Sequence, residues 1–111
     1  MDAAVRDQLI ASHPNQKLYF IRSPDDGIEI VVTGAPSAVW MKYRSMTGNF
    51  SDPAQRAMAQ EMLVQGSIVY PEWTAFSKEL SDRKLTGFYE VAAEKIRLYT
   101  GVRMNVESGE L

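Results

Sequence analysis

The sequence predicts an α+β fold that is mostly helical, with one N-terminal β-hairpin packed against about four helices. Residues 17–33 hold two runs of β-branched and aromatic residues separated by a turn sequence. Residues 37–100 carry apolar side chains at helical spacing, and helix start and stop residues divide them into four segments. The length of 111 residues suits one compact domain, which we place at residues 1–101.

The predicted hairpin at residues 17–33 follows a short helix at residues 3–12. Its turn, residues 23–27, contains a proline that presets φ and a glycine that readily adopts a positive φ. We interpret Asp25 and Asp26 as turn formers rather than as a metal-binding or acid–base pair, because adjacent side chains in a tight turn usually point apart. In the second strand Ile28, Ile30 and Val32 share one face, because side chains alternate along a strand.

Four helices are predicted at about residues 37–47, 52–65, 71–83 and 86–100. Polar caps or prolines start them: Ser37, Asp52 with Pro53, Pro71, and Thr86. Glycines end three of them: Gly48, Gly66 and Gly101. The last helix has a consistent apolar face, which we expect to be buried: Phe88, Val91, Ala92, Ile96 and Tyr99. Residues 67–70 are predicted to be extended, because the residue before a proline avoids the helical region. Residues 102–111 are predicted to form a flexible tail.

Composition and charge weigh against several classes of function. The formal net charge is −2 and the basic residues are scattered, whereas nucleic-acid binders usually concentrate positive charge. The chain has no cysteine, which excludes disulfides and thiolate chemistry. It lacks a signal-peptide pattern and the apolar run of roughly 20 residues that a membrane span needs. We therefore expect a soluble, cytosolic protein.

The residue types needed for catalysis are few. His13 is the only histidine, and its Ser-His-Pro context indicates a surface turn rather than a catalytic triad. One histidine without cysteine cannot form a conventional zinc site. The glycines are too widely spaced for a phosphate-binding loop. We predict no catalytic, cofactor-binding or metal-binding residue, and we expect a protein that binds another protein rather than an enzyme.

Large aromatic side chains are the candidates for such a binding surface. Trp40 and Tyr43 fall on the predicted helix 37–47, and Trp73 and Phe76 on the predicted helix 71–83. In a domain this small such rings can remain partly uncovered, and an uncovered aromatic patch is typical of a protein-binding site. The candidate patch is therefore Trp40, Tyr43, Trp73 and Phe76. Three of the six methionines are interpreted as core residues: Met46, Met58 and Met62.

The order of these elements resembles the small tail assembly chaperones of tailed bacteriophages and prophages. The resemblance covers roughly residues 16–101. It rests on the sequence Gly34-Ala35-Pro36-Ser37-Ala38-Val39-Trp40 after a strand, a helix leading to Leu63-Val64, the block Ile68-Val69-Tyr70-Pro71-Glu72, and a last helix ending in Leu98-Tyr99-Thr100-Gly101. Similar proteins often carry Pro-Gly before the last helix, where this chain has Leu85-Thr86-Gly87.

The resemblance implies a non-catalytic role in building a phage tail. Such chaperones bind the long helical tape measure protein, keep it soluble and help recruit tail tube subunits. They act in the cytoplasm of the bacterial host and are absent from the finished virion. The resemblance leaves open whether the protein forms a homo-oligomer. It also leaves open whether a longer form is made by ribosomal frameshifting.

Three other functions remain open from the residues alone. The strongest is a generic interaction or regulatory module, similar to an antitoxin, that binds one folded partner in a fixed stoichiometry. A small-molecule binder or enzyme would need a defined pocket with convergent polar groups. A nucleic-acid binder would need a contiguous basic face.

Overall fold

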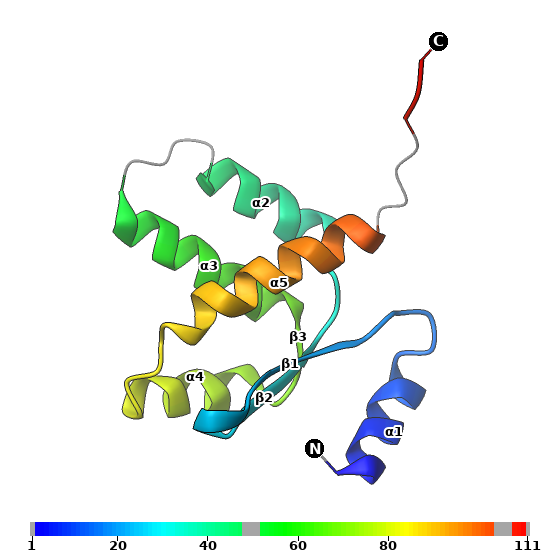
Figure 1. Ribbon diagram of the computed structural model, residues 1–111, viewed down its shortest axis with the longest axis vertical. Helices are drawn as coiled ribbons and strands as arrows, with labels where there is room; N and C mark the ends of the chain where they lie inside the picture. Colours follow the sequence, from blue (N-terminus) through cyan, green and yellow to red (C-terminus); the bar gives the residue numbers. More distant parts are fainter. Residues whose placement is uncertain (1, 48–51, 104–107, 111) are drawn as a thin grey trace.

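The computed structural model describes residues 2–47, 52–103 and 108–110. Its elements are, in order, α1 (Ala3–Ser12), β1 (Tyr19–Ser23), the 3₁₀ turn η1 (Pro24–Asp26), β2 (Ile28–Val32), α2 (Ser37–Thr47), α3 (Pro53–Ser67), β3 (Ile68–Tyr70), α4 (Trp73–Asp82) and α5 (Phe88–Arg103). This arrangement confirms the predicted α+β fold with its N-terminal hairpin (Figure 1). In Figure 1, α2, α3 and α5 lie above the sheet, and α1 stands apart from the other helices.

The hairpin has the predicted turn. β1 pairs antiparallel with β2, from Tyr19 opposite Val32 to Ser23 opposite Ile28. Gly27 has a φ of 67°, the left-handed conformation that glycine adopts without a steric penalty. The Ser23 hydroxyl donates a hydrogen bond of 2.7 Å to the Asp26 carboxylate, so this aspartate serves the turn itself.

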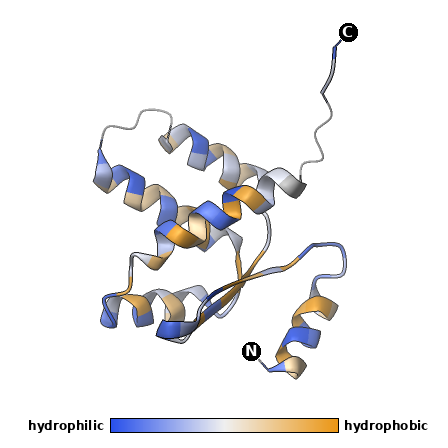
Figure 2. Ribbon diagram, in the orientation of Figure 1, coloured by the Kyte–Doolittle hydropathy of each residue, from blue (hydrophilic) through white to orange (hydrophobic). Residues whose placement is uncertain are grey.

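The extended segment predicted before Pro71 joins the hairpin as a third strand. β3 pairs antiparallel with β2, giving the strand order β1-β2-β3. The sheet buries one face against the helices, and Ile28, Ile30 and Val32 lie on it as predicted. Figure 2 shows mainly hydrophobic residues along β1 and β2, where the strands meet the helical part of the chain.

Helix starts follow the sequence closely at α3 and less closely elsewhere. The Asp52 carboxylate accepts the N–H of Ala54 at 2.9 Å, which confirms the predicted N-cap. Ser37 is instead the first helical residue of α2, because the Pro36 carbonyl accepts the N–H of Trp40 at 2.9 Å. The chain leaves the sheet at Pro71, and α4 therefore begins two residues later, at Trp73.

The predicted helix ends are wrong at two glycines. α3 continues through Gly66 to Ser67, and α5 continues through Gly101 to Arg103. Glycine permits a helix to end but does not force it to end. The residues that follow the glycine determine whether the helix continues. The predicted tail, residues 102–111, thus includes two residues that belong to α5, and residues 108–110 have no regular structure. The stop predicted at Gly48 lies outside the described residues.

Thr100 connects the last helix to the segment after β2. Its buried hydroxyl donates a hydrogen bond of 2.7 Å to the Ile96 carbonyl and accepts the N–H of Ala35 at 2.9 Å. Ala35 and Thr100 are 65 positions apart in the sequence. This hydroxyl therefore holds the start of α2 against the end of α5.

Replacing Thr100 by valine is expected to lower the free energy of unfolding by about 1 to 2 kcal/mol. Valine keeps the shape of the side chain but removes the oxygen that accepts the N–H of Ala35. Urea denaturation measures the change, and Thr74→Val on an exposed position of α4 is the matched control. The control should change the free energy of unfolding by less than about 0.5 kcal/mol. An equal loss in both variants would show that the hydrogen bond contributes nothing specific.

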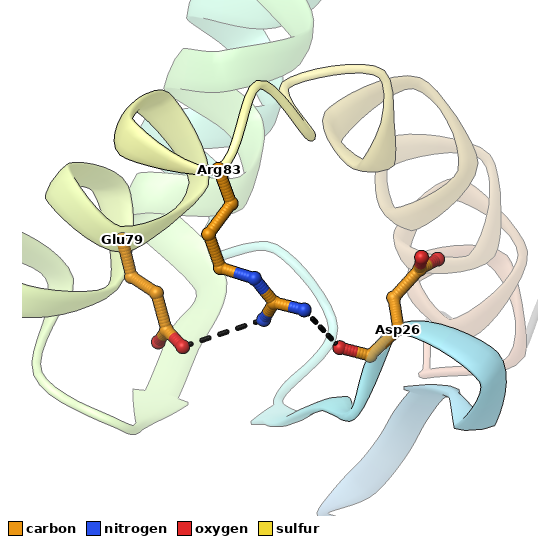
Figure 3. Close-up of polar contacts among 3 residues, drawn as sticks. All are labelled: Asp26, Glu79 and Arg83. Carbon is orange, nitrogen blue, oxygen red and sulfur yellow. Dashed lines mark hydrogen bonds and ion pairs between the residues drawn. The ribbon is translucent and has the colours of Figure 1, made fainter.

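Arg83 joins the end of α4 to the hairpin turn (Figure 3). Its guanidinium donates a hydrogen bond to the backbone carbonyl of Asp26. A second nitrogen of the same group lies 3.4 Å from the Glu79 carboxylate, one turn earlier in α4. The contact is exposed to solvent, so it orients the turn relative to α4 more than it stabilises the fold.

Candidate functional site

A cleft of about 780 Å³ opens between α2, α3 and α5. Its apolar lining consists of Trp40 and Tyr43 from α2 and Val91 and Ala93 from α5. Trp40 is half-buried and stacks on Tyr43, with ring centroids 5.7 Å apart and ring planes 23° apart. Because α2 and α5 both belong to the packed core, the cleft is bounded by rigid helices.

An apolar strip continues from the cleft along α5. Val91 and Leu98 are seven residues apart, so they lie on the same side of the helix, roughly 10 Å from one another. Val91 is 55% exposed and Leu98 is 60% exposed. Two large apolar side chains left open on one helix face, next to a cleft, form a surface suited to a protein partner.

The charged lining of the cleft is mainly basic. Its charged residues are Arg44 from α2, Arg56 from α3, and Glu90, Glu94, Lys95 and Arg97 from α5. Four basic side chains against two carboxylates make a formal charge of +2, in a chain whose net charge is −2. Arg97 pairs with Glu94 at 3.0 Å, whereas Arg44 and Lys95 form no ion pair with a described residue.

The four residues of the predicted patch do not form one surface. Tyr43 is 8% exposed and Phe76 is 3% exposed, and both belong to the hydrophobic core. Trp73 lies half-buried on α4, where its ring packs 5.6 Å from Tyr89 and 6.4 Å from Phe76. Only Trp40 and Tyr43 line the cleft, and Trp40 is the more accessible of the two. Tyr43 and Phe76 are therefore core residues, because neighbouring helices cover the faces that carry them.

Two other residues interpreted from sequence as buried are exposed. Val91 fits the apolar spacing of the last helix but lies at the edge of the stripe that Ala92 and Ile96 bury. Met58 on α3 is 63% exposed, whereas Met46 and Met62 pack against the core as expected. The available signal was the charge around Val91, since Glu94 and Lys95 share its side of α5.

Two titratable side chains outside the cleft, His13 and Tyr89, belong to the structure of the fold. The His13 Nδ1 atom lies 2.9 Å from the Leu9 carbonyl, so this histidine caps the C-terminus of α1. Burial raises the pKa of Tyr89 above its ordinary value of 10.0, and the charge of Glu61 raises it further. Tyr89 is therefore a neutral phenol at physiological pH.

A second, smaller groove lies between α1 and the outer face of the sheet, with a volume of about 520 Å³. Ile10 from α1 and Phe20 from β1 line it, and both are exposed. The Arg22 guanidinium sits 4.8 Å from the centre of the Phe20 ring and also pairs with Glu29 at 2.6 Å. Arg22 is thus paired within the chain, and the lining also contains the basic residues Arg6 and Lys17.

The part of the chain that the structure describes contains no group of three His, Cys, Asp or Glu side chains placed to hold a metal ion. No helix within it is long and apolar enough to cross a membrane. Comparison of the chain with models of protein families, with curated proteins and with solved structures found no match.

Proposed function

We propose that this protein is a tail assembly chaperone of a bacteriophage or prophage. It binds the tape measure protein, keeps it soluble during assembly and helps recruit tail tube subunits. The role is non-catalytic and is carried out in the cytoplasm of the bacterial host. The resemblance in sequence order is the origin of the proposal, and two features of the structure support it.

The first supporting feature is that the sequence blocks carrying the resemblance meet in space. The Gly34–Trp40 block leads from β2 into α2, the Ile68–Glu72 block forms β3 and the entry to α4, and the Leu98–Gly101 block lies near the end of α5. The Ala35 N–H donates to the Thr100 hydroxyl at 2.9 Å, so the first and last blocks are in direct contact. The first and second blocks are joined through the residues just before them, because the Thr33 N–H donates to the Ser67 carbonyl at 3.0 Å. These hydrogen bonds hold the blocks together in the fold, which is expected if the blocks that carry the resemblance form one structural unit.

The second supporting feature is the cleft between α2, α3 and α5. A long helical client presents apolar side chains at intervals of three, four and seven residues, and grooves between helices receive such side chains. The half-buried Trp40 and the exposed Val91 are suited to that contact. Many copies along one client would gain by avidity, while a moderate affinity per copy would permit later release to the tail tube.

Co-expression tests the proposal. The partner to test is the product of a long, helix-rich reading frame, which the proposal expects immediately downstream. The readouts are the solubility of that protein and the mass of the complex by size-exclusion chromatography. We expect the long protein to be soluble only with this chain, in a complex that contains many copies of it. An insoluble long protein would contradict the proposal. A complex holding one copy on a folded partner would instead favour an interaction module of fixed stoichiometry.

A further inference from the structure

We infer that the cleft between α2, α3 and α5 receives an acidic amphipathic α-helix, in which carboxylates flank two apolar anchors two turns apart. The inference rests on the proposed function for the helical nature of the client. The preference for carboxylates comes from the charges of the cleft itself. This preference specifies which segments of a long client the protein would bind and which segments it would not bind.

The spacing of the apolar side chains sets the anchors. Val91 and Leu98 are two turns apart on α5. Val91 lines the cleft together with Trp40 of α2, and Leu98 lies beyond the cleft on the same side of α5. A client helix lying along α5 therefore meets apolar groups at an interval of seven residues, which equals the i, i+7 repeat of an amphipathic helix. Both anchors would contact α5, and the anchor at Val91 would also meet the Trp40 ring.

The basic side chains determine what flanks those anchors. Arg44 on α2 and Lys95 on α5 line the cleft, are exposed and form no ion pair with a described residue. Carboxylates beside the anchors of a bound helix would pair with these two cations. A helix carrying lysines in the same places would meet like charge instead, and like charge is an effective means of rejecting a partner.

The same lining favours a peptide over a nucleic acid. Glu90 and Glu94 interrupt the basic residues of the cleft, so the lining is not a continuous basic stripe along which a phosphate backbone could run. The protein as a whole is also acidic, with a net charge of −2. The positive charge is local and is combined with an apolar strip, whereas nucleic-acid surfaces usually have extended basic stripes.

Peptide titration tests the inference directly. Two designed amphipathic helical peptides share leucine anchors at i and i+7, and carry either glutamates or lysines beside them. The readout is Trp40 fluorescence in a Trp73→Phe background, which leaves Trp40 as the single tryptophan. We expect the glutamate peptide to bind with a Kd at least about tenfold lower than the lysine peptide, a difference that shrinks as salt is added.

Charge reversal locates the binding site. Arg44→Glu combined with Lys95→Glu should reverse the preference between the two peptides. Lys42→Glu combined with Lys78→Glu changes the net charge equally at exposed positions outside the cleft, and should leave the preference intact. Circular dichroism confirms that both double variants fold. A preference that is absent in the unmodified protein, or that survives reversal at Arg44 and Lys95, would overturn the inference. Tighter binding of a single-stranded oligonucleotide than of the glutamate peptide would also overturn it.

Co-expression with the long downstream protein separates this inference from the proposed function. If the unmodified chain keeps that protein soluble and the Arg44→Glu, Lys95→Glu variant does so equally well, the assignment of the cleft fails and the chaperone role stands. If the unmodified chain fails to keep it soluble, the chaperone role fails, while the peptide titration still decides the charge preference of the cleft.

Discussion

Replacing Leu63 by alanine is expected to lower the free energy of unfolding by about 2 to 5 kcal/mol. Leu63 is fully buried on α3, which packs against both α2 and α5. The substitution removes buried apolar surface and leaves a cavity that rigid neighbouring helices fill only in part. In thermal unfolding, Tm should fall by roughly 8 °C or more.

Met58→Ala is the matched control for Leu63→Ala, because it shortens a large apolar side chain on the same helix at an exposed position. It should change the free energy of unfolding by less than about 0.5 kcal/mol. A similar loss in both variants would mean that α3 does not face the core in the way the structure shows.

Replacing Gly66 by alanine is expected to destabilise the protein by roughly 1 to 3 kcal/mol, although alanine favours helix over glycine by about 1 kcal/mol. A Cβ atom at this position would lie 2.7 Å from both Cγ atoms of Val39 on α2. The Val39 side chain or the two helices would have to shift to accommodate it, and a β-branched side chain has few alternative rotamers. Because α2 and α3 are two walls of the cleft, the same variant should also weaken binding of the acidic peptide.

Two further variants separate the steric effect at Gly66 from helix propensity. Gly101→Ala, also within a helix, has no atom within 4 Å of the added Cβ, so it should stabilise the protein by up to about 1 kcal/mol. Adding Val39→Ala to Gly66→Ala should recover much of the loss, giving a favourable coupling energy in a double-mutant cycle by urea denaturation. If Gly66→Ala were as stabilising as Gly101→Ala, the close approach of α2 and α3 would be disproved.

The sequence by itself determined the local elements of this protein. The turn at residues 23–27, the Asp52 cap with Pro53 behind it, and the buried face of β2 all follow from interactions within a few residues. Turn conformation, helix capping and side-chain alternation along a strand are local effects. They can therefore be predicted without knowing how the helices and strands pack together. The α+β class followed from the order of these elements.

Only the tertiary structure decided which side chains are exposed and which come together. Gly66 was expected to end a helix, but its missing side chain lets Val39 of α2 approach α3 instead. Tyr43 and Phe76 were candidates for an exposed patch, and helix packing buries both. Val91 was assigned to the buried stripe, and the same packing leaves it open at the cleft.

The physical reason is that helical periodicity defines the apolar side of a helix but not how far a neighbouring helix covers it. A residue at the edge of an apolar stripe is buried or exposed according to the crossing of the next helix, which depends on contacts distant in sequence. The basic character of the cleft arises in the same way. Arg44, Arg56 and Lys95 are dispersed along the chain, and the packing of α2, α3 and α5 places them around one cleft.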